Sequence, residues 1–196
     1  CLRGLRCARL GGDMAELAHA HSLLGVIRLE EGQTRRAVAQ ELRALGMYEQ
    51  LGHLTGQADA LNNLAISYAS LGEWPQAVER CQECLRIASR IGDLNLMAVV
   101  HNNLGEVFLV QGEVARAKAE FRWTIDCRAR LGHVGLAALA EANFGQALAA
   151  EGRLAEARRA LERSLRTFHE INADAFAADV QVRLAEVLAL EGRTER

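Results

Sequence analysis

Proline is almost absent from this chain of 196 residues, in which Pro75 is the only one. Aromatic residues make up only 5%, and Val and Ile do not form the runs that are typical of β-strands. Alanine and leucine are abundant instead, and both are strong helix formers. Because proline interrupts helix interiors, its scarcity together with this composition predicts an all-α protein.

Long apolar segments are also missing, since no stretch reaches 18 apolar residues, and we therefore expect no membrane span. The N-terminal residues lack the sustained apolar core of a signal peptide. The five cysteines are an odd number, which does not fit a disulfide framework and favours a cytoplasmic location. A formal net charge of −2 gives no argument for binding nucleic acid or an anionic membrane.

The chain repeats itself every 40 residues, and four series of small residues keep this step without an insertion. The series are Gly12, Gly52, Gly92 and Gly132, with Asn172 in the fifth place; Gly32, Gly72, Gly112, Gly152 and Gly192; Ala18, Ala58, Ala98, Ala138 and Ala178; and Ala37, Ala77, Ala117 and Ala157. The two glycine series lie 20 residues apart. Each repeat is therefore expected to hold two helices, A and B, joined by glycine-containing turns.

Four full repeats span residues 13–52, 53–92, 93–132 and 133–172. Residues 1–12 match the second half of a helix B, and residues 173–196 match a helix A that is expected to end at Gly192. The sequence thus predicts ten helices in one continuous solenoid over residues 1–196.

The third repeat reads His101-x2-Leu104-Gly105-x2-Phe108, then Ala117-x3-Phe121. The second and fourth repeats keep this order with Leu64-Ala65 and Phe144-Gly145 on helix A and with Cys81 and Leu161 on helix B. The first repeat departs from it, because Arg28 and Glu41 replace large apolar residues. This pattern resembles the tetratricopeptide repeat (TPR) family, over essentially the whole chain.

The resemblance implies a right-handed superhelical solenoid of antiparallel helix pairs, in which helices A line a concave groove. The repeat of 40 residues is longer than the family's usual one of about 34, and it lacks the closing proline. It is similar to the arrays of kinesin light chains, spindle-orientation adaptors and bacterial regulators. We expect a scaffold that binds a peptide or protein segment. The alternative is the sensor or autoinhibitory region of a larger bacterial transcriptional or ATPase regulator.

Asparagine recurs at the same place in successive helices A, although it is a mediocre helix former. Its amide offers a donor and an acceptor, as a peptide backbone requires, and TPR proteins use asparagine here to hold a peptide main chain. Alternatively, these residues bond to a neighbouring helix or were copied by duplication. We predict a peptide-binding face of Asn62, Asn63, Asn102, Asn103, Asn143, Glu106, Gln146, Arg183 and Asp59.

Arg28 and Arg183 are the basic residues of the predicted helices A, whereas helices B carry most of the arginines. An apolar or basic ligand is therefore expected rather than an acidic one, and we expect neither nucleic acid nor membrane as a partner. The apolar segment 187–190 has no partner helix after it, which favours further repeats or self-association through open ends of the solenoid.

The pair Cys81-x2-Cys84 falls at core positions of helix B, so buried packing is predicted instead of a zinc or redox site. His19 and His21 point to different faces of one helix, and His53 lies in a turn where a capping role is expected. No phosphate-binding loop and no nucleophile motif occurs. We expect no cofactor, no metal and no catalytic residue.

Overall fold

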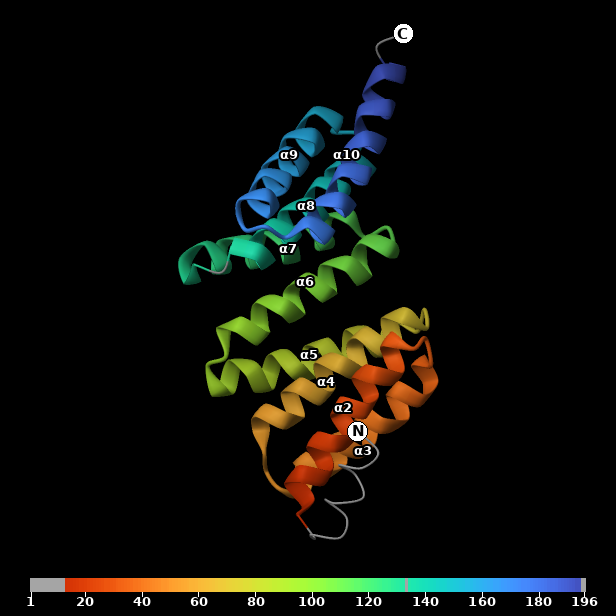
Figure 1. Ribbon diagram of the computed structural model, residues 1–196, viewed down its shortest axis with the longest axis vertical. Coiled ribbons are helices and arrows are strands. Elements are labelled where there is room, and N and C mark those ends of the chain that lie inside the picture. The colour runs from red at the N-terminus through yellow and green to blue at the C-terminus, as the bar shows by residue number, and fades with distance from the viewer. Residues whose placement is uncertain (1–12, 133, 195–196) are drawn as a thin grey trace. The chain divides into compact units, whose positions relative to one another are not determined.

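The structure, a computed structural model, describes residues 13–132 and 134–194. These residues form helices and no strand, which confirms the all-α prediction (Figure 1). The helices are α2 (Met14–Glu30), α3 (Thr34–Gln50), α4 (Leu54–Ser70), α5 (Trp74–Ile91), α6 (Leu94–Val110), α7 (Val114–Leu131), α8 (Val134–Ala150), α9 (Leu154–Glu170) and α10 (Asp174–Thr194). Even-numbered helices are the predicted helices A, and odd-numbered ones are helices B. The expected partial helix over residues 1–12 lies outside the described residues.

The predicted turns carry a backbone conformation that favours glycine. Seven glycines of the two series, from Gly32 to Gly152, have φ angles between 64° and 77°. Asn172 takes their place in the last turn with φ 55°, a conformation that asparagine tolerates better than most residues. Gly192 differs, because α10 continues through it to Thr194. The expected helix end at Gly192 is therefore wrong, since glycine permits a left-handed turn but does not impose one.

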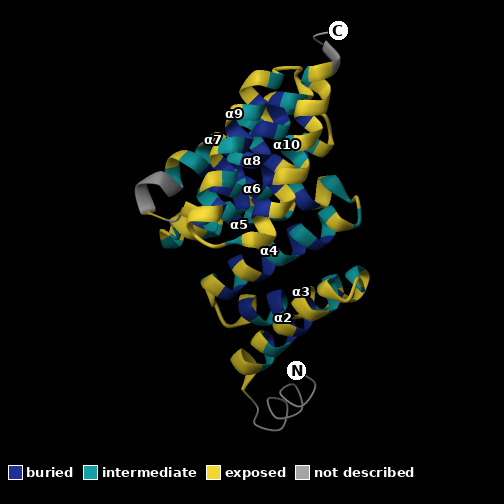
Figure 2. Ribbon diagram, turned by 45° about the horizontal axis from the view of Figure 1, so that its top comes forward, coloured by how far each residue is buried: buried dark blue, intermediate teal, exposed yellow. Residues whose placement is uncertain are grey.

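The helices form two compact units, Cys1–Asn103 and Leu104–Arg196, which we call the N-terminal and C-terminal units. In the N-terminal unit, α3 packs on α2, α4 on α3 and α5 on α4. In the C-terminal unit, α7, α8, α9 and α10 pack in the same sequential manner. Buried residues line the inward faces of the helices (Figure 2). No helix of the described residues is long and apolar enough to cross a membrane.

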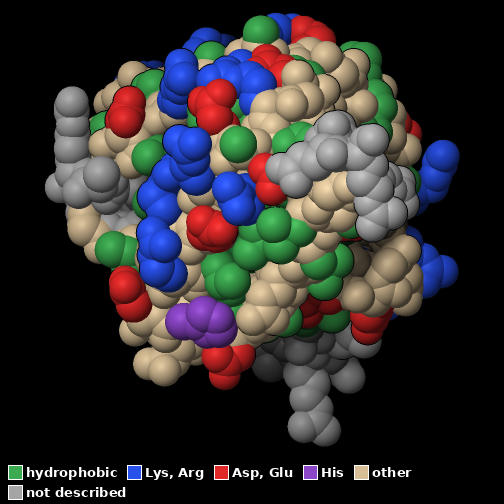
Figure 3. Space-filling view, turned by 90° about the horizontal axis from the view of Figure 1, so that it is seen from above, with side chains coloured by type: hydrophobic (Ala, Val, Ile, Leu, Met, Phe, Trp, Pro, Cys, Tyr) green, Lys and Arg blue, Asp and Glu red, His purple; other side chains and the backbone are tan. Residues whose placement is uncertain are grey.

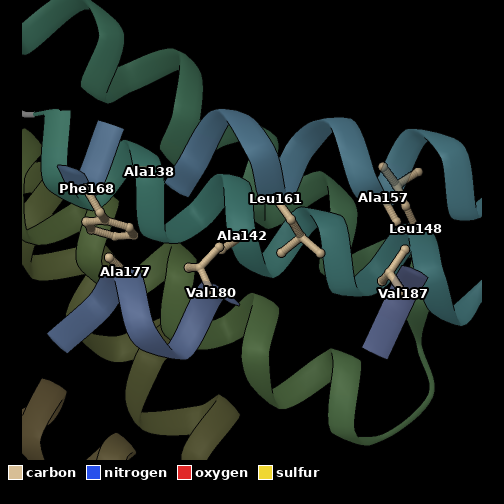
Figure 4. Packing of buried hydrophobic residues seen from close by; sticks show 9 residues of the cluster. All are labelled: Ala138, Ala142, Leu148, Ala157, Leu161, Phe168, Ala177, Val180 and Val187. Atoms are coloured by element: carbon tan, nitrogen blue, oxygen red, sulfur yellow. The ribbon is translucent and has the colours of Figure 1, made fainter. Parts of the chain in front are cut away.

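The core of the C-terminal unit is built in layers between α8, α9 and α10 (Figure 4). In each layer a large residue is surrounded by smaller ones. The layers are Ala138, Phe168 and Ala177; Ala142, Leu161 and Val180; and Leu148, Ala157 and Val187. Two of the predicted alanine positions, Ala138 and Ala157, thus contribute to this core.

Close packing of helix A on helix B depends on a small residue opposite a large one. A Cβ atom added to Gly105 would overlap the ring of Phe121, and one added to Gly145 would lie 3.1 Å from Leu161 Cγ. Gly25 has the same relation to Glu41. The predicted role of the small residues, to let two helix backbones approach, is therefore confirmed.

This packing yields a test with a matched control. Gly105→Ala should lower the free energy of unfolding by about 1–3 kcal/mol, because Phe121 must shift or strain. Gly46→Ala, within α3 and with no heavy atom near the added Cβ, should raise it by about 0.5–1 kcal/mol through backbone entropy. Urea titrations followed by circular dichroism would measure both. Equal effects of the two substitutions would contradict the packing argument.

Candidate functional site

The predicted asparagine positions connect successive helices A within each unit. In the N-terminal unit, the Asn63 Nδ2 group donates to Ser22 Oγ at 3.4 Å and to Glu41 Oε1 at 3.1 Å. The Asn103 Nδ2 group donates to Asn62 Oδ1 at 3.0 Å. Each bond joins a helix A to the repeat before it. The amide nitrogens of Asn63 and Asn103 therefore bond to neighbouring helices, which is the structural alternative that the sequence analysis left open.

The C-terminal unit continues the pattern with charged partners. The Asn143 Nδ2 group donates to Glu106 Oε1 at 2.8 Å, and its oxygen accepts a bond of 2.8 Å from Arg183 Nη1. A second guanidinium nitrogen of Arg183 lies 2.7 Å from an Asp179 carboxylate oxygen. We call Asn63, Asn103, Asn143 and Arg183 the ladder.

The amide oxygens divide the ladder into two kinds of position. The oxygen of Asn143 is engaged by Arg183, and the Asn143 side chain is only 3% exposed. Asn63 and Asn103 are half-buried, and their oxygens accept no hydrogen bond from the described residues. Each of these two amides therefore keeps an acceptor for a further N–H donor.

The remaining predicted site residues are placed less uniformly. Asn102 is buried and Asn62 is half-buried beside Asn103, whereas Glu106 is exposed and Gln146 is half-buried. Asp59 is exposed and forms no hydrogen bond with the ladder. Desolvation by neighbouring residues raises the pKa of the Asp59 carboxyl, as does the nearby charge of Asp93. Asp59 therefore adds negative charge to α4 without joining the hydrogen-bonded network.

Glu41 on α3 is a member of the site that the sequence analysis treated only as a departure from the repeat. It stands where Cys81, Phe121 and Leu161 stand, and it is 1% exposed. Its carboxyl group accepts hydrogen bonds from Ser22 Oγ at 3.0 Å and from Asn63 Nδ2 at 3.1 Å. The sequence signal for Glu41 was a carboxyl at a repeat position that is otherwise filled by apolar residues.

Burial raises the pKa of Glu41 to about 7, and the hydrogen bonds from Ser22 and Asn63 lower it only in part. The charge of Asp59 acts in the same direction as burial. No cation forms an ion pair with Glu41 in the described part of the chain. Glu41 therefore holds one end of the ladder in place through a carboxyl that is partly protonated at neutral pH.

The raised pKa makes stability depend on pH. The folded state retains a proton on Glu41 that the unfolded state releases above about pH 4.5, so stability should fall as pH rises from 4.5 to 7. Compared with Glu41→Gln, the wild-type protein should lose roughly 1–3 kcal/mol of unfolding free energy across this window. Glu49→Gln, an exposed position on the same helix, is the control. If wild type and Glu41→Gln show parallel pH profiles, the proposed protonation is wrong.

Cys81 and Cys84 are both fully buried, which confirms the predicted packing role. The Cys84 thiol donates to the Ala58 carbonyl oxygen at 3.2 Å, and Ser164 donates to Ala138 in the same register at 2.7 Å. Burial raises the pKa of the Cys84 thiol to about 12. The described residues contain no group of three or more metal-ligating side chains. His53 caps α4 by accepting a 3.0 Å bond from Gly56 N, as expected.

A thiol that is buried and kept protonated should be unreactive. We expect Cys84 of the native protein to resist iodoacetamide at pH 8 and to react fully in urea, as measured by peptide mass spectrometry. Cys84→Ser should leave the fold intact, because Ser164 makes the equivalent bond in the fourth repeat. Rapid native alkylation of Cys84 would show that its side chain is not held as described.

Residues 56–130 match the family model of the tetratricopeptide repeat. This segment is a tetratricopeptide-repeat region. The fold is similar to that of BtubC (BKLC) from P. vanneervenii, with TM-score 0.83 and 21% identity, over 97% of this chain and 81% of that one. Comparison of the sequence with curated proteins gives no match.

Two further solved structures share the TPR fold. One is the Rap protein complexed with competence and sporulation factor, with TM-score 0.80 and 14% identity over 93% of this chain. The other is a signal transduction ATPase from Pyrococcus horikoshii with a tetratricopeptide repeat sensor, with TM-score 0.76 and 14% identity over 86% of this chain. The present chain spans 50% of the Rap chain and 26% of the ATPase chain.

Proposed function

We propose that this TPR chain is a non-catalytic scaffold that binds a peptide or protein segment along its helices A. The observation that carries the proposal is the half-used amide at Asn63 and Asn103. Each nitrogen is bonded within the protein, which fixes the side chain, and each oxygen remains available to accept a bond. A fixed acceptor loses little entropy when a backbone N–H of a ligand binds to it.

Charge on the same helices defines the ligand further. Arg28 pairs with Glu31 at 2.8 Å, and Arg183 pairs with Asp179. The carboxylates of Asp59 and Glu106 are exposed. Both arginines are thus already neutralised by carboxylates and offer little attraction to an acidic ligand. An extended segment with apolar or basic side chains is therefore favoured over an acidic one.

The similarity to an ATPase that contains a tetratricopeptide repeat sensor supports a second candidate, in which the chain is the sensor region of a larger regulator. The Rap structure in complex with competence and sporulation factor is consistent with either role. Both candidates require ligand binding by the repeats, so the same binding experiment tests their shared step.

The acceptor role can be separated from the structural role of the ladder by two substitutions at one position. A peptide selected on the protein from a random display library would serve as the ligand. Asn103→Ala removes both the donor and the acceptor. It should weaken binding about tenfold, which corresponds to the upper end of the net free energy that one hydrogen bond contributes. Asn103→Asp loses the donor to Asn62 but keeps an acceptor, so affinity should stay within about threefold.

Gln82→Ala, which removes an exposed amide from helix B of the same unit, should leave affinity unchanged. Thermal unfolding of each variant checks that the fold is retained. Equal losses for Asn103→Ala and Asn103→Asp would mean that only the structural bond to Asn62 matters. Selected peptides rich in Asp and Glu would contradict the charge argument.

A further inference from the structure

Asp59 and Val99 occupy the same repeat position beside the ladder, and we call them the flanking pair. Asp59 lies four residues before Asn63 on α4, and so one helical turn nearer the start of that helix on the same face. Val99 has the same relation to Asn103 on α6. All four residues belong to the N-terminal unit. Asp59 is exposed and Val99 is half-buried, so one edge of the ladder offers a carboxylate over α4 and an apolar side chain over α6.

The Asp59 carboxylate forms no ion pair with a described residue, and α4 and α6 contain no lysine or arginine. Basic side chains gather elsewhere, for example in the band that Figure 3 shows. Desolvation raises the pKa of Asp59, and so does the charge of Asp93, while His53 acts in the opposite direction. Asp93 itself accepts a hydrogen bond of 2.9 Å from Leu96 N at the start of α6. A cation beside Asp59 would therefore meet two carboxylates and no competing lysine or arginine of these two helices.

The geometry of an extended ligand turns this difference into a sequence requirement. In an extended chain, residues two apart direct their N–H groups to the same side and their side chains to the same face. A ligand whose N–H groups bond to the oxygens of Asn63 and Asn103 crosses α4 and then α6. Side chains that point toward the starts of these helices meet the flanking pair. Those that point the other way meet Ile66, which is half-buried and lies three residues after Asn63.

We propose that the flanking pair selects ligands in which a lysine or arginine lies over α4 and an apolar side chain lies over α6, both on the same side of an extended backbone. The two ligand residues are then separated by an even number of positions. This inference rests on the proposed function and adds to it the residues that read the ligand sequence. The ladder holds the backbone, and Asp59 and Val99 determine which side chains fit.

The probe is a peptide selected on the whole chain from a random display library, with binding measured by fluorescence anisotropy. Each basic residue of the peptide is replaced in turn by a neutral counterpart, citrulline for arginine and norleucine for lysine. Asp59→Asn should weaken binding of the parent peptide about fivefold, as the loss of one exposed ion pair does at its upper end. It should have no effect on the peptide that lacks the one basic residue facing Asp59. Glu49→Gln, which removes an exposed carboxylate from α3 of the same unit, is the matched control.

Val99→Asp gives α6 the carboxylate that α4 already has, and it should reverse the preference at that position. A peptide with lysine in place of the apolar residue should then bind more tightly than the parent peptide. Loss of folding cannot produce such a reversal. An unchanged preference would overturn the role of Val99.

The inference is also overturned if the selected peptides lack a basic residue, or if Asp59→Asn weakens all peptide variants equally. If Asn103→Ala weakens binding and Asp59→Asn does not, the flanking pair is not selective and the proposed function stands. If neither substitution weakens binding, the ligand does not lie along the ladder, and the proposed function fails together with this inference. Thermal unfolding of each variant confirms that the fold is retained.

Discussion

The contact of a small residue on helix A with a large residue on helix B is the constraint on which the rest of this structure depends. Where Gly105 faces Phe121 and Gly145 faces Leu161, a single added methyl group would strain the pair. This closeness determines how the helices of one repeat pack. Within each unit, the ladder residues then bond from one helix A to the repeat before it.

Much of the fold could be predicted from the sequence, because the same pattern of small residues recurs in each repeat. A glycine step of 40 residues located every described turn, and it placed Asn172 in the last one before the structure showed its positive φ. The failure at Gly192 has a physical cause. A glycine lowers the cost of a reversal, but the reversal itself comes from a second helix that packs back on the first.

The site was less predictable, because recurrence alone does not show which atoms of a side chain are used. The sequence placed Asn63, Asn103 and Asn143 on one side of the helices, but an amide has two ends. The structure shows the nitrogens bonded between helices and leaves two oxygens without a partner in the described chain. Glu41 was harder still, since a pattern that compares residue types records it as a mismatch. Its function depends on Ser22 and Asn63, which come from two other helices.

The buried carboxyl of Glu41, the small residue Gly25 and the amide of Asn63 depend on one another energetically. A buried carboxyl without a cation is costly, and the chain lessens that cost by giving Glu41 two neutral donors and a pKa near neutrality. Gly25 makes the room that the carboxyl requires, so the small-residue rule is used here for a polar group instead of an apolar one. The Asn63 nitrogen therefore donates to Glu41, while the Asn63 oxygen remains available to accept a hydrogen bond. On the proposed function, a ligand N–H that binds this oxygen contacts a side chain that also donates a hydrogen bond to Glu41. Any effect of Glu41 protonation on ligand affinity would then be matched by an equal effect of the ligand on the proton affinity of Glu41.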